Sequence, residues 1–257
     1  MNLVEVYATV TDRQGSIVEG LTAADFRVAE DGVGQTITAF APGDVPLSLA
    51  VGVDRSFSMA GRRLELVKAA ADALIDALAP ADQVTVIAIG SEREVLAPVT
   101  TDKAAARRAI DALAPWGTTP LHDAVIDAID AIEPAKGRRA LVVLSDGSDR
   151  GSEASESDVI AYARRKDVLV YPIAVDSARP PLFAELASVT GGRSASGKNA
   201  ADLRHAAVAI ASELRHQYLL GYTPSHPPSA QPEWHAIDVR VAREGVVVRA
   251  RDGYYAR

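Results

Sequence analysis

The sequence of 257 residues contains no cysteine and few aromatic residues, which make up 5% of the chain. Without cysteine there can be no disulfide, no thiolate nucleophile and no metal site built on sulfur. Hydrophobic residues make up 48% and charged residues 24% of the chain, as in an ordinary globular protein with a buried core. The length allows one large domain, or one domain with an appendage.

Basic residues are also fewer than acidic ones: the chain has 27 Lys and Arg against 34 Asp and Glu, which gives a net charge of -7. Nucleic-acid-binding proteins normally show the opposite balance, so DNA and RNA are not expected partners. No apolar run approaches the ~20 residues of a membrane span, and none is predicted. The first five residues lack the basic and apolar regions of a secretion signal. They predict either a cytoplasmic protein or an extracytoplasmic one, in the periplasm or on the cell surface, whose leader was removed.

The middle of the chain alternates apolar runs with helical patterns. Between the runs, apolar residues recur at steps of three and four, which is typical of helices with one buried face. Pro120 suits the first position of one helix, with Thr119 as its N-cap. This alternation predicts an α/β fold with a doubly wound, mostly parallel sheet. The runs lack polar alternation, as in strands covered on both faces, and span residues 47–54, 84–90, 140–146 and 168–175.

The two ends of the chain indicate β structure instead. Runs at 3–10 and 36–40 with turn signals between them predict a small β-meander. Segments at 218–222, 235–241 and 246–248 predict strands around a proline-rich loop (Pro224, Pro227, Pro228 and Pro232). Neither end is long enough for a core of its own, so we expect both to share one discontinuous β-sandwich. The predicted organisation is residues 1–45 and 216–257 for the two halves of the sandwich and 46–215 for the α/β domain.

Oxygen-bearing side chains follow two of the predicted central strands. Asp54, Ser56 and Ser58 come at the end of the first, Asp146 ends a later one, and Thr119 opens a helix. Ligand sites in open α/β sheets lie at the carboxyl ends of the strands, so these loops can converge. Carboxylate and hydroxyl oxygens suit a hard cation such as Mg²⁺.

The motifs have a familiar order: Asp-x-Ser-x-Ser from Asp54, Thr-x-Leu-x-Asp from Thr119 and Ser-Asp-Gly around Asp146. Over residues 46–215 the chain resembles the von Willebrand factor A domain with its metal-ion-dependent adhesion site. The flanks, including Glu30-Asp31-Gly32 and Asp252-Gly253-Tyr254, resemble bacterial proteins related to that family.

The resemblance implies a Rossmann-like fold and a non-enzymatic adhesion module. Ser56 and Ser58 would bind Mg²⁺, or Mn²⁺ or Ca²⁺, through their hydroxyls, and Asp54, Thr119 and Asp146 would bind it directly or through water. An exposed Asp or Glu of a protein or peptide partner would complete the shell. His122 departs from the residue type often found at its position, which leaves open a partner-binding role.

Other interpretations remain at this point. Asp54, Ser56 and Ser58 could form a helix-capping turn. A metal-dependent phosphatase-like hydrolase is an alternative function, although its chemistry needs a second Asp where Ser56 stands. A structural envelope module with an unused site is another. The histidines show no metal-ligand spacing and are expected to be surface or packing residues; they are His122, His205, His216, His226 and His235.

Overall fold

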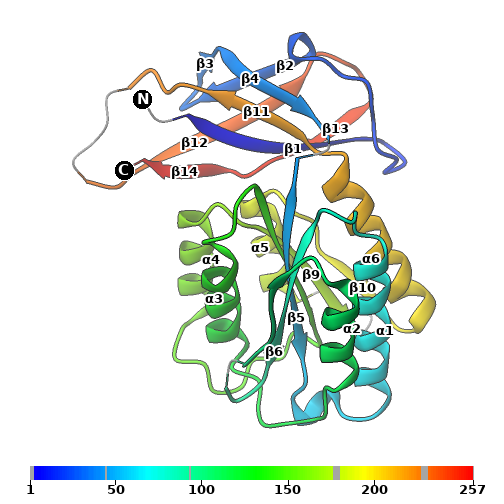
Figure 1. Cartoon of the computed structure of the whole chain (residues 1–257). Helices are drawn as coiled ribbons and strands as arrows, with labels where there is room; N and C mark the ends of the chain where they lie inside the picture. The colour runs from blue at the N-terminus through cyan, green and yellow to red at the C-terminus, as the bar shows by residue number, and fades with distance from the viewer. Residues whose placement is uncertain (1–2, 44, 93, 176–179, 227–230, 257) are drawn as a thin grey trace.

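The computed structural model describes residues 3–43, 45–92, 94–175, 180–226 and 231–256. Pro227 and Pro228 of the expected proline-rich loop lie outside these ranges. Figure 1 shows an α/β part, from β5 to α6, beneath a β-sandwich built from both ends of the chain. None of the described helices is long and apolar enough to cross a membrane.

The α/β part contains a six-stranded sheet in the order β10-β9-β8-β5-β6-β7. All neighbours pair in parallel except β6 and β7, which are antiparallel. The doubly wound fold is therefore confirmed, and all four predicted strands are present. The two edge strands were not predicted, because β10 is very short and β7 is partly exposed. The strands are β5 (Leu47–Asp54), β6 (Gln83–Ile89), β7 (Glu94–Thr100), β8 (Arg138–Ser145), β9 (Leu169–Val175) and β10 (Ala195–Gly197).

Helices cover both faces of this sheet (Figure 1). On one face lie α1 (Arg62–Asp76), α2 (Lys103–Asp111) and α6 (Ala200–Arg215), whose apolar residues join one core cluster. On the other lie α3 (Leu121–Ile132), α4 (Glu156–Arg165) and α5 (Pro181–Thr190).

The predicted start of α3 is wrong by one residue. Pro120 is the N-cap rather than the first helical residue, because its ψ of 72° is not helical. The carbonyl of Thr119 accepts instead from the Leu121 N–H at 2.8 Å. Thr119 is therefore not the N-cap, and the His122 N–H of the first turn is capped from another loop, by the Ser152 hydroxyl at 3.1 Å and the Asp149 carboxylate at 3.2 Å.

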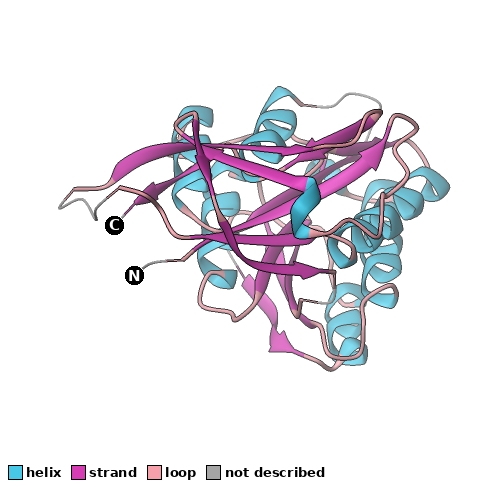
Figure 2. Ribbon diagram, turned by 90° about the horizontal axis from the view of Figure 1, so that it is seen from above, coloured by secondary structure: helices cyan, strands magenta, loops and turns pink. Residues whose placement is uncertain are grey.

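Two antiparallel sheets make the sandwich, in the orders β13-β1-β11-β4 and β14-β12-β2-β3. Strands from the two ends of the chain alternate in the first sheet, and in the second the C-terminal pair β14-β12 adjoins the N-terminal pair β2-β3, which confirms the predicted discontinuous β-sandwich. Figure 2 looks down on these strands, which spread across the α/β part. The strands are β1 (Val4–Asp12), β2 (Phe26–Glu30), β3 (Val33–Gln35), β4 (Ile37–Pro42), β11 (Tyr218–Tyr222), β12 (Glu233–Val241), β13 (Val246–Arg249) and β14 (Gly253–Ala256).

The predicted N-terminal β-meander is wrong. β1 pairs with β11 and β13, and β4 pairs with β11, so neither pairs with its neighbour in sequence. Residues 13–25 carry the chain from one sheet to the other, beginning with a turn in which Ile17 bridges back to Thr11. Strands β2 and β3 form a local hairpin at Asp31 and Gly32. Pairing with the far end of the chain is favoured because it lets β11 lie between two strands rather than at an exposed edge.

The sandwich has a core of its own. The rings of Phe26, Phe40 and Tyr218 pack together with centroids 5.1–6.0 Å apart. The Tyr218 hydroxyl donates to the Val18 carbonyl at 2.9 Å. These aromatic residues come from both sheets and both ends of the chain, so they hold the sandwich together.

A buried polar cluster joins the sandwich to the α/β part. Glu213 of α6, 3% exposed, accepts from the Tyr171 hydroxyl at 3.0 Å and pairs with Arg249 of β13 at 2.7 Å. The Gln217 amide donates to the Thr9 hydroxyl and to Tyr171, both at 3.0 Å. Burial raises the pKa of Tyr171 well above its ordinary value, so this hydroxyl stays protonated as a donor. Strands β1, β9 and β13 are thereby tied to helix α6.

Replacing Phe26 by alanine should lower the free energy of unfolding by about 3–5 kcal/mol, because it removes a ring that is 2% exposed. Val33→Ala, at a side chain that is 58% exposed, is the matched control and should change stability little. Equilibrium unfolding in urea measures both. Equal midpoints for the two variants would contradict a core centred on Phe26.

Candidate metal-binding site

Three loops meet at the carboxyl end of the central sheet. The loop after β5 contains the short 3₁₀ helix Phe57–Met59, and the Phe57 N–H donates to the Gly117 carbonyl at 3.0 Å. The Arg150 N–H, from the loop after β8, donates to the Thr119 carbonyl at 2.7 Å. These bonds bring the three predicted motifs to one end of the sheet. They connect the loops through backbone groups and leave side chains available for a ligand.

Asp54, the last residue of β5, is fully buried. Its Oδ1 accepts from the Ser56 N–H at 2.9 Å, and its Oδ2 accepts from the Ser145 hydroxyl at 2.6 Å. It forms no ion pair with a basic side chain among the described residues. Burial raises the pKa of Asp54, and the nearby negative charge of Asp146 adds to the effect. The site thus holds a buried acid that lacks a counter-ion.

Ser56 and Ser58 place two hydroxyls beside each other, with their Oγ atoms 3.0 Å apart. Ser56 is 1% exposed, whereas Ser58 lies on the surface. Neither hydroxyl caps the helix α1, whose N-cap is Gly61. The helix-capping alternative for these two serines is therefore not what the structure shows.

Asp146 lies just after β8, and its side chain is 8% exposed. Its Oδ1 accepts from the Ser148 N–H at 3.0 Å, and its Oδ2 pairs with Arg63 at 3.3 Å. Arg63 also donates to the Ser58 carbonyl at 3.2 Å, so it links two of the loops. The sequence did not point to Arg63, because an arginine in the first turn of a helix is normally a surface residue.

Thr119 is 2% exposed. Its neighbour Thr118 is held by Ser91, whose hydroxyl accepts from the Thr118 N–H at 2.9 Å and lies 3.3 Å from the Thr118 hydroxyl. Of the two threonines, Thr119 is therefore the one whose side chain is not engaged in this contact with Ser91.

His122 lies in the first turn of α3 and is 9% exposed. Its Nδ1 lies 2.9 Å from the Ala154 carbonyl, and its backbone N–H donates to the Ser152 hydroxyl at 3.1 Å. These bonds attach the loop after β8 to α3. Supporting that loop is thus a role for His122 in the described structure.

Comparisons with known proteins identify the family of the central part of the chain. The family model for the von Willebrand factor type A domain matches residues 49–148. Residues 49–148 belong to a von Willebrand factor A domain. No curated protein matches the sequence.

Solved structures share the fold. An aerotolerance-related membrane protein from Bacteroides fragilis is 21% identical, with a TM-score of 0.54 over 65% of this chain and 98% of its own. BatB from Bacteroides thetaiotaomicron has the same identity and coverage, with a TM-score of 0.55. A von Willebrand factor type A protein from Catenulispora acidiphila is 14% identical, with a TM-score of 0.58 over 90% of this chain and 74% of its own. At such identities the likeness is one of fold.

The donor groups of this A domain fit a hard divalent cation. Two carboxylates, Asp54 and Asp146, lie close enough for each other's charge to matter, and serine hydroxyls lie alongside. A buried carboxylate without a counter-ion is costly, and a bound cation would supply the missing charge. Oxygen donors without sulfur or imidazole match the preference of Mg²⁺.

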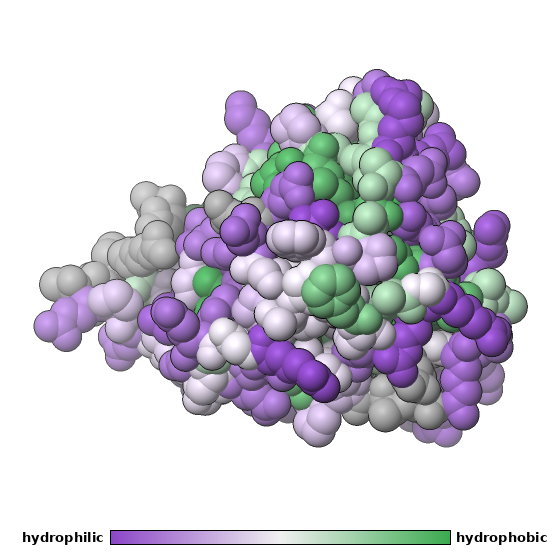
Figure 3. All heavy atoms as spheres, turned by 90° about the horizontal axis from the view of Figure 1, so that it is seen from below, coloured by the Kyte–Doolittle hydropathy of each residue, from purple (hydrophilic) through white to green (hydrophobic). Residues whose placement is uncertain are grey.

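Exposed aromatic side chains flank these loops. Phe57 is 65% exposed and Trp116 is 55% exposed. The Trp116 N–H donates to the Arg55 carbonyl at 2.7 Å, which places both aromatics on the loops of the site. Figure 3 shows this end of the molecule, where weakly polar and apolar residues gather at the centre and hydrophilic residues surround them.

Two glycines let the loops approach closely. At Gly147, with φ of +79°, an added Cβ would lie 2.2 Å from the Pro180 Cγ. At Gly117, with φ of +72°, it would lie 2.2 Å from the Ser91 Oγ. Only glycine fits these positions without moving the loop that follows β8 or the one that precedes α3.

Gly147→Ala should destabilise the domain more than Gly151→Ala. Both positions have positive φ, so each alanine carries a backbone penalty of about 1 kcal/mol, but the space around Gly151 is empty to 4 Å. The difference between their thermal midpoints therefore isolates the clash with Pro180. Identical midpoints would contradict the tight packing of the Asp146 loop.

Proposed function

We propose that this protein is a non-enzymatic binding module in which a divalent cation, Mg²⁺ in the first place, links the A domain to an acidic side chain of a protein or peptide partner. The burial of the Asp54 carboxylate without a counter-ion, next to a second carboxylate and two hydroxyls, carries the proposal. The proposed metal-binding residues are Asp54, Ser56, Ser58, Thr119 and Asp146.

The chemistry of these residues favours capture of an anion. Hydroxyls of Ser56, Ser58 and Thr119 are neutral, so they leave much of a cation's charge uncompensated, and a bound cation would offer one position to an anionic oxygen. The net charge of -7 gives no long-range attraction for an acidic partner. Affinity must therefore come from the site and the surface next to it.

That adjacent surface is suited to a protein partner. Phe57 and Trp116 would be covered when a partner docks, and exposed aromatics of this kind often carry much of the binding energy. The hydrophilic surroundings would form the rim of the interface (Figure 3). We propose a partner segment in which Asp or Glu lies next to apolar residues.

The enzyme alternative has less support. A phosphatase of the haloacid-dehalogenase type needs a second Asp two positions after the first, and here Ser56 stands there with its hydroxyl against that of Ser58. His122, the nearest candidate for a general base, lies against the Ala154 carbonyl. The other alternative is a structural module whose site is not used. Such a module would bind its partner equally well with and without a divalent cation, whereas the proposed adhesion module would not.

Asp54→Asn should abolish Mg²⁺ binding, measured by titration calorimetry on the chelator-treated protein. It should also raise the stability of the metal-free protein by about 0.5–2 kcal/mol, because it removes an uncompensated buried charge while keeping the shape of the side chain. Glu92→Gln, at an exposed carboxylate on a neighbouring loop, is the control and should bind Mg²⁺ as the wild type does. Undiminished binding in Asp54→Asn would remove the basis of the proposal.

Peptide arrays test the partner chemistry. Peptides with an Asp flanked by apolar residues should bind in Mg²⁺, whereas the same peptides with Asn, or in EDTA, should not. Phe57→Ala should weaken binding about tenfold, equivalent to about 1.4 kcal/mol. Val95→Ala, at an exposed apolar side chain on edge strand β7, is its control. Equal signals from Asp and Asn peptides would show that the carboxylate is not the contact.

A further inference from the structure

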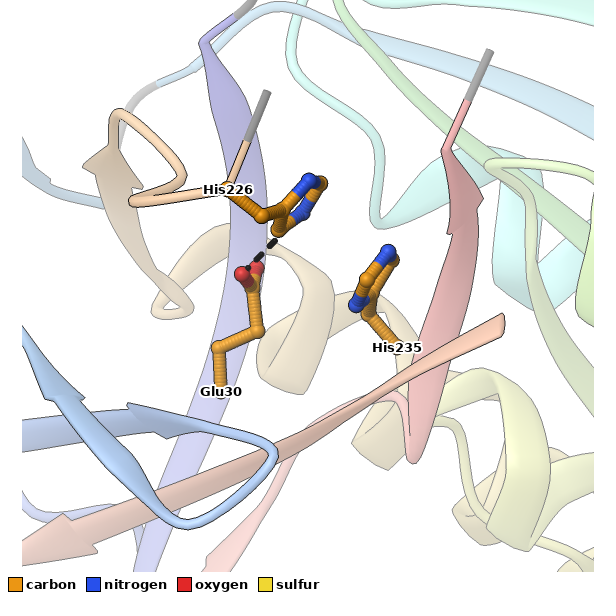
Figure 4. A group of neighbouring side chains, drawn as sticks. All are labelled: Glu30, His226 and His235. Atoms are coloured by element: carbon orange, nitrogen blue, oxygen red, sulfur yellow. Dashed lines mark ion pairs between the residues drawn. The ribbon is translucent and has the colours of Figure 1, made fainter. Parts of the chain in front are cut away.

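Three side chains with metal-binding atoms meet inside the sandwich, far from the A-domain site. Glu30 ends β2, His235 lies on β12, and His226 follows β11 (Figure 4). Their candidate ligand atoms all lie within 4.8 Å of one another. Glu30 is 3% exposed and His235 is 6% exposed, so the group is largely shielded from water.

One nitrogen of this group is buried and unsatisfied. His235 Nδ1 lies 2.7 Å from the Asp31 carboxylate, which can only accept, so Nδ1 carries the hydrogen. In the neutral ring this leaves Nε2 with a free lone pair. Within the described part of the chain Nε2 has no hydrogen-bond partner, although it is shielded from solvent. A buried polar atom without a partner is costly and rare.

The other ligand atoms are also held in place. Glu30 Oε2 accepts from the hydroxyls of Tyr222 at 2.7 Å and Tyr254 at 2.9 Å. Glu30 Oε1 lies 3.2 Å from His226 Nε2. The rings of His226 and His235 face each other with centroids 3.8 Å apart. The two rings are stacked, at 8° to one another, and His226 Nε2 also lies 3.2 Å from the Tyr254 hydroxyl. The carboxylate and the two imidazoles are thus close together, with His226 held by Glu30 and Tyr254.

We propose that Glu30, His226 and His235 form a binding site for a divalent transition-metal ion, for which Zn²⁺ is the best match. Two imidazoles and one carboxylate are a common zinc ligand set, with a fourth position for water. The bond from His235 to Asp31 is the carboxylate support that orients such a ligand. The metal would fasten the segment after β11 to strands β2 and β12.

Metal binding requires the His226 ring to reorient. Zinc lies about 2.0–2.2 Å from nitrogen and oxygen ligands, so ligand atoms around it are about 3.5 Å apart. His226 lies outside both neighbouring strands, and its side chain is 25% exposed, so its ring has room to move. To point a nitrogen lone pair at the ion, the ring would tilt out of its stack on His235 and give up its contact with the Tyr254 hydroxyl. The bonds to Asp31 and the tyrosines keep His235 and Glu30 where they are.

The test is a Zn²⁺ titration of the untagged, chelator-treated full chain by calorimetry, in excess Mg²⁺ so that the oxygen-rich A-domain site is not the reporter. One Zn²⁺ per chain should bind, and Co²⁺ should give the visible absorption of a low-coordinate nitrogen and oxygen site. His226→Ala should weaken Zn²⁺ binding at least about tenfold and abolish the rise in thermal midpoint that Zn²⁺ causes.

His205→Ala, at an exposed histidine of α6, is the matched control and should keep both effects. Because His226 is partly exposed, its loss should leave the metal-free fold intact, as circular dichroism can show. Equal Zn²⁺ affinity in the wild type and His226→Ala, or no Zn²⁺ binding at all, would overturn the site and leave a His226–Glu30 ion pair. Asp54→Asn should not affect Zn²⁺ binding, so this inference and the proposed function can fail separately.

Discussion

The burial of the Asp54 carboxylate is the constraint around which the A domain is built. Strand β5 lies between β6 and β8 and is buried along its whole length, so its last side chain cannot avoid the interior. Hydrogen bonds from Ser145 and the Ser56 N–H hold the carboxylate but do not neutralise it. Keeping a charge in such a place costs free energy, and a bound cation would offset that cost. The close turns at Gly117 and Gly147 serve the same arrangement, because they bring the other loops up to the end of β5.

The sandwich has a different relation to the site. It lies at the opposite end of the central sheet and joins the A domain through Glu213, Tyr171 and Gln217 (Figure 1). Helix α6 leads into β11 through only two residues, so the two parts are connected by a short path as well as by the buried polar cluster. If both metal proposals hold, the molecule would have two metal sites with different ligand types at its two ends. Oxygen donors at one end would take a hard cation, and nitrogen-rich donors at the other would take a transition metal.

Much of the α/β fold could be predicted from the sequence, because each of its central strands and helices has a local hydrophobic pattern. The apolar run before Asp54 predicts a buried strand, which lies where expected, and the metal site indicated by Asp54, Ser56 and Ser58 stays a prediction. The sandwich could be predicted only in outline. Its ends were expected to share a core, but the partners of β1 are about 200 residues away, and no local pattern specifies them.

The residues that sequence reasoning missed are those whose role depends on such distant contacts. Arg63 pairs with Asp146 across 83 positions, and its place in a helix gives no hint of this. His235 looks like an ordinary inward-facing residue of an amphipathic strand, and His226 belongs to an irregular segment. Only the pairing of β12 with β2 brings His235 beside Glu30. Metal-ligand spacing rules cannot detect a group assembled from positions 30, 226 and 235.

We propose above all that the end of β5 holds a cation. The most direct test is anomalous diffraction from a crystal of the full chain soaked in Mn²⁺. We expect an anomalous peak among the oxygens of Asp54, Ser56, Ser58, Thr119 and Asp146. A fully ordered site with no peak there, and with Arg63 still paired to Asp146, would contradict it.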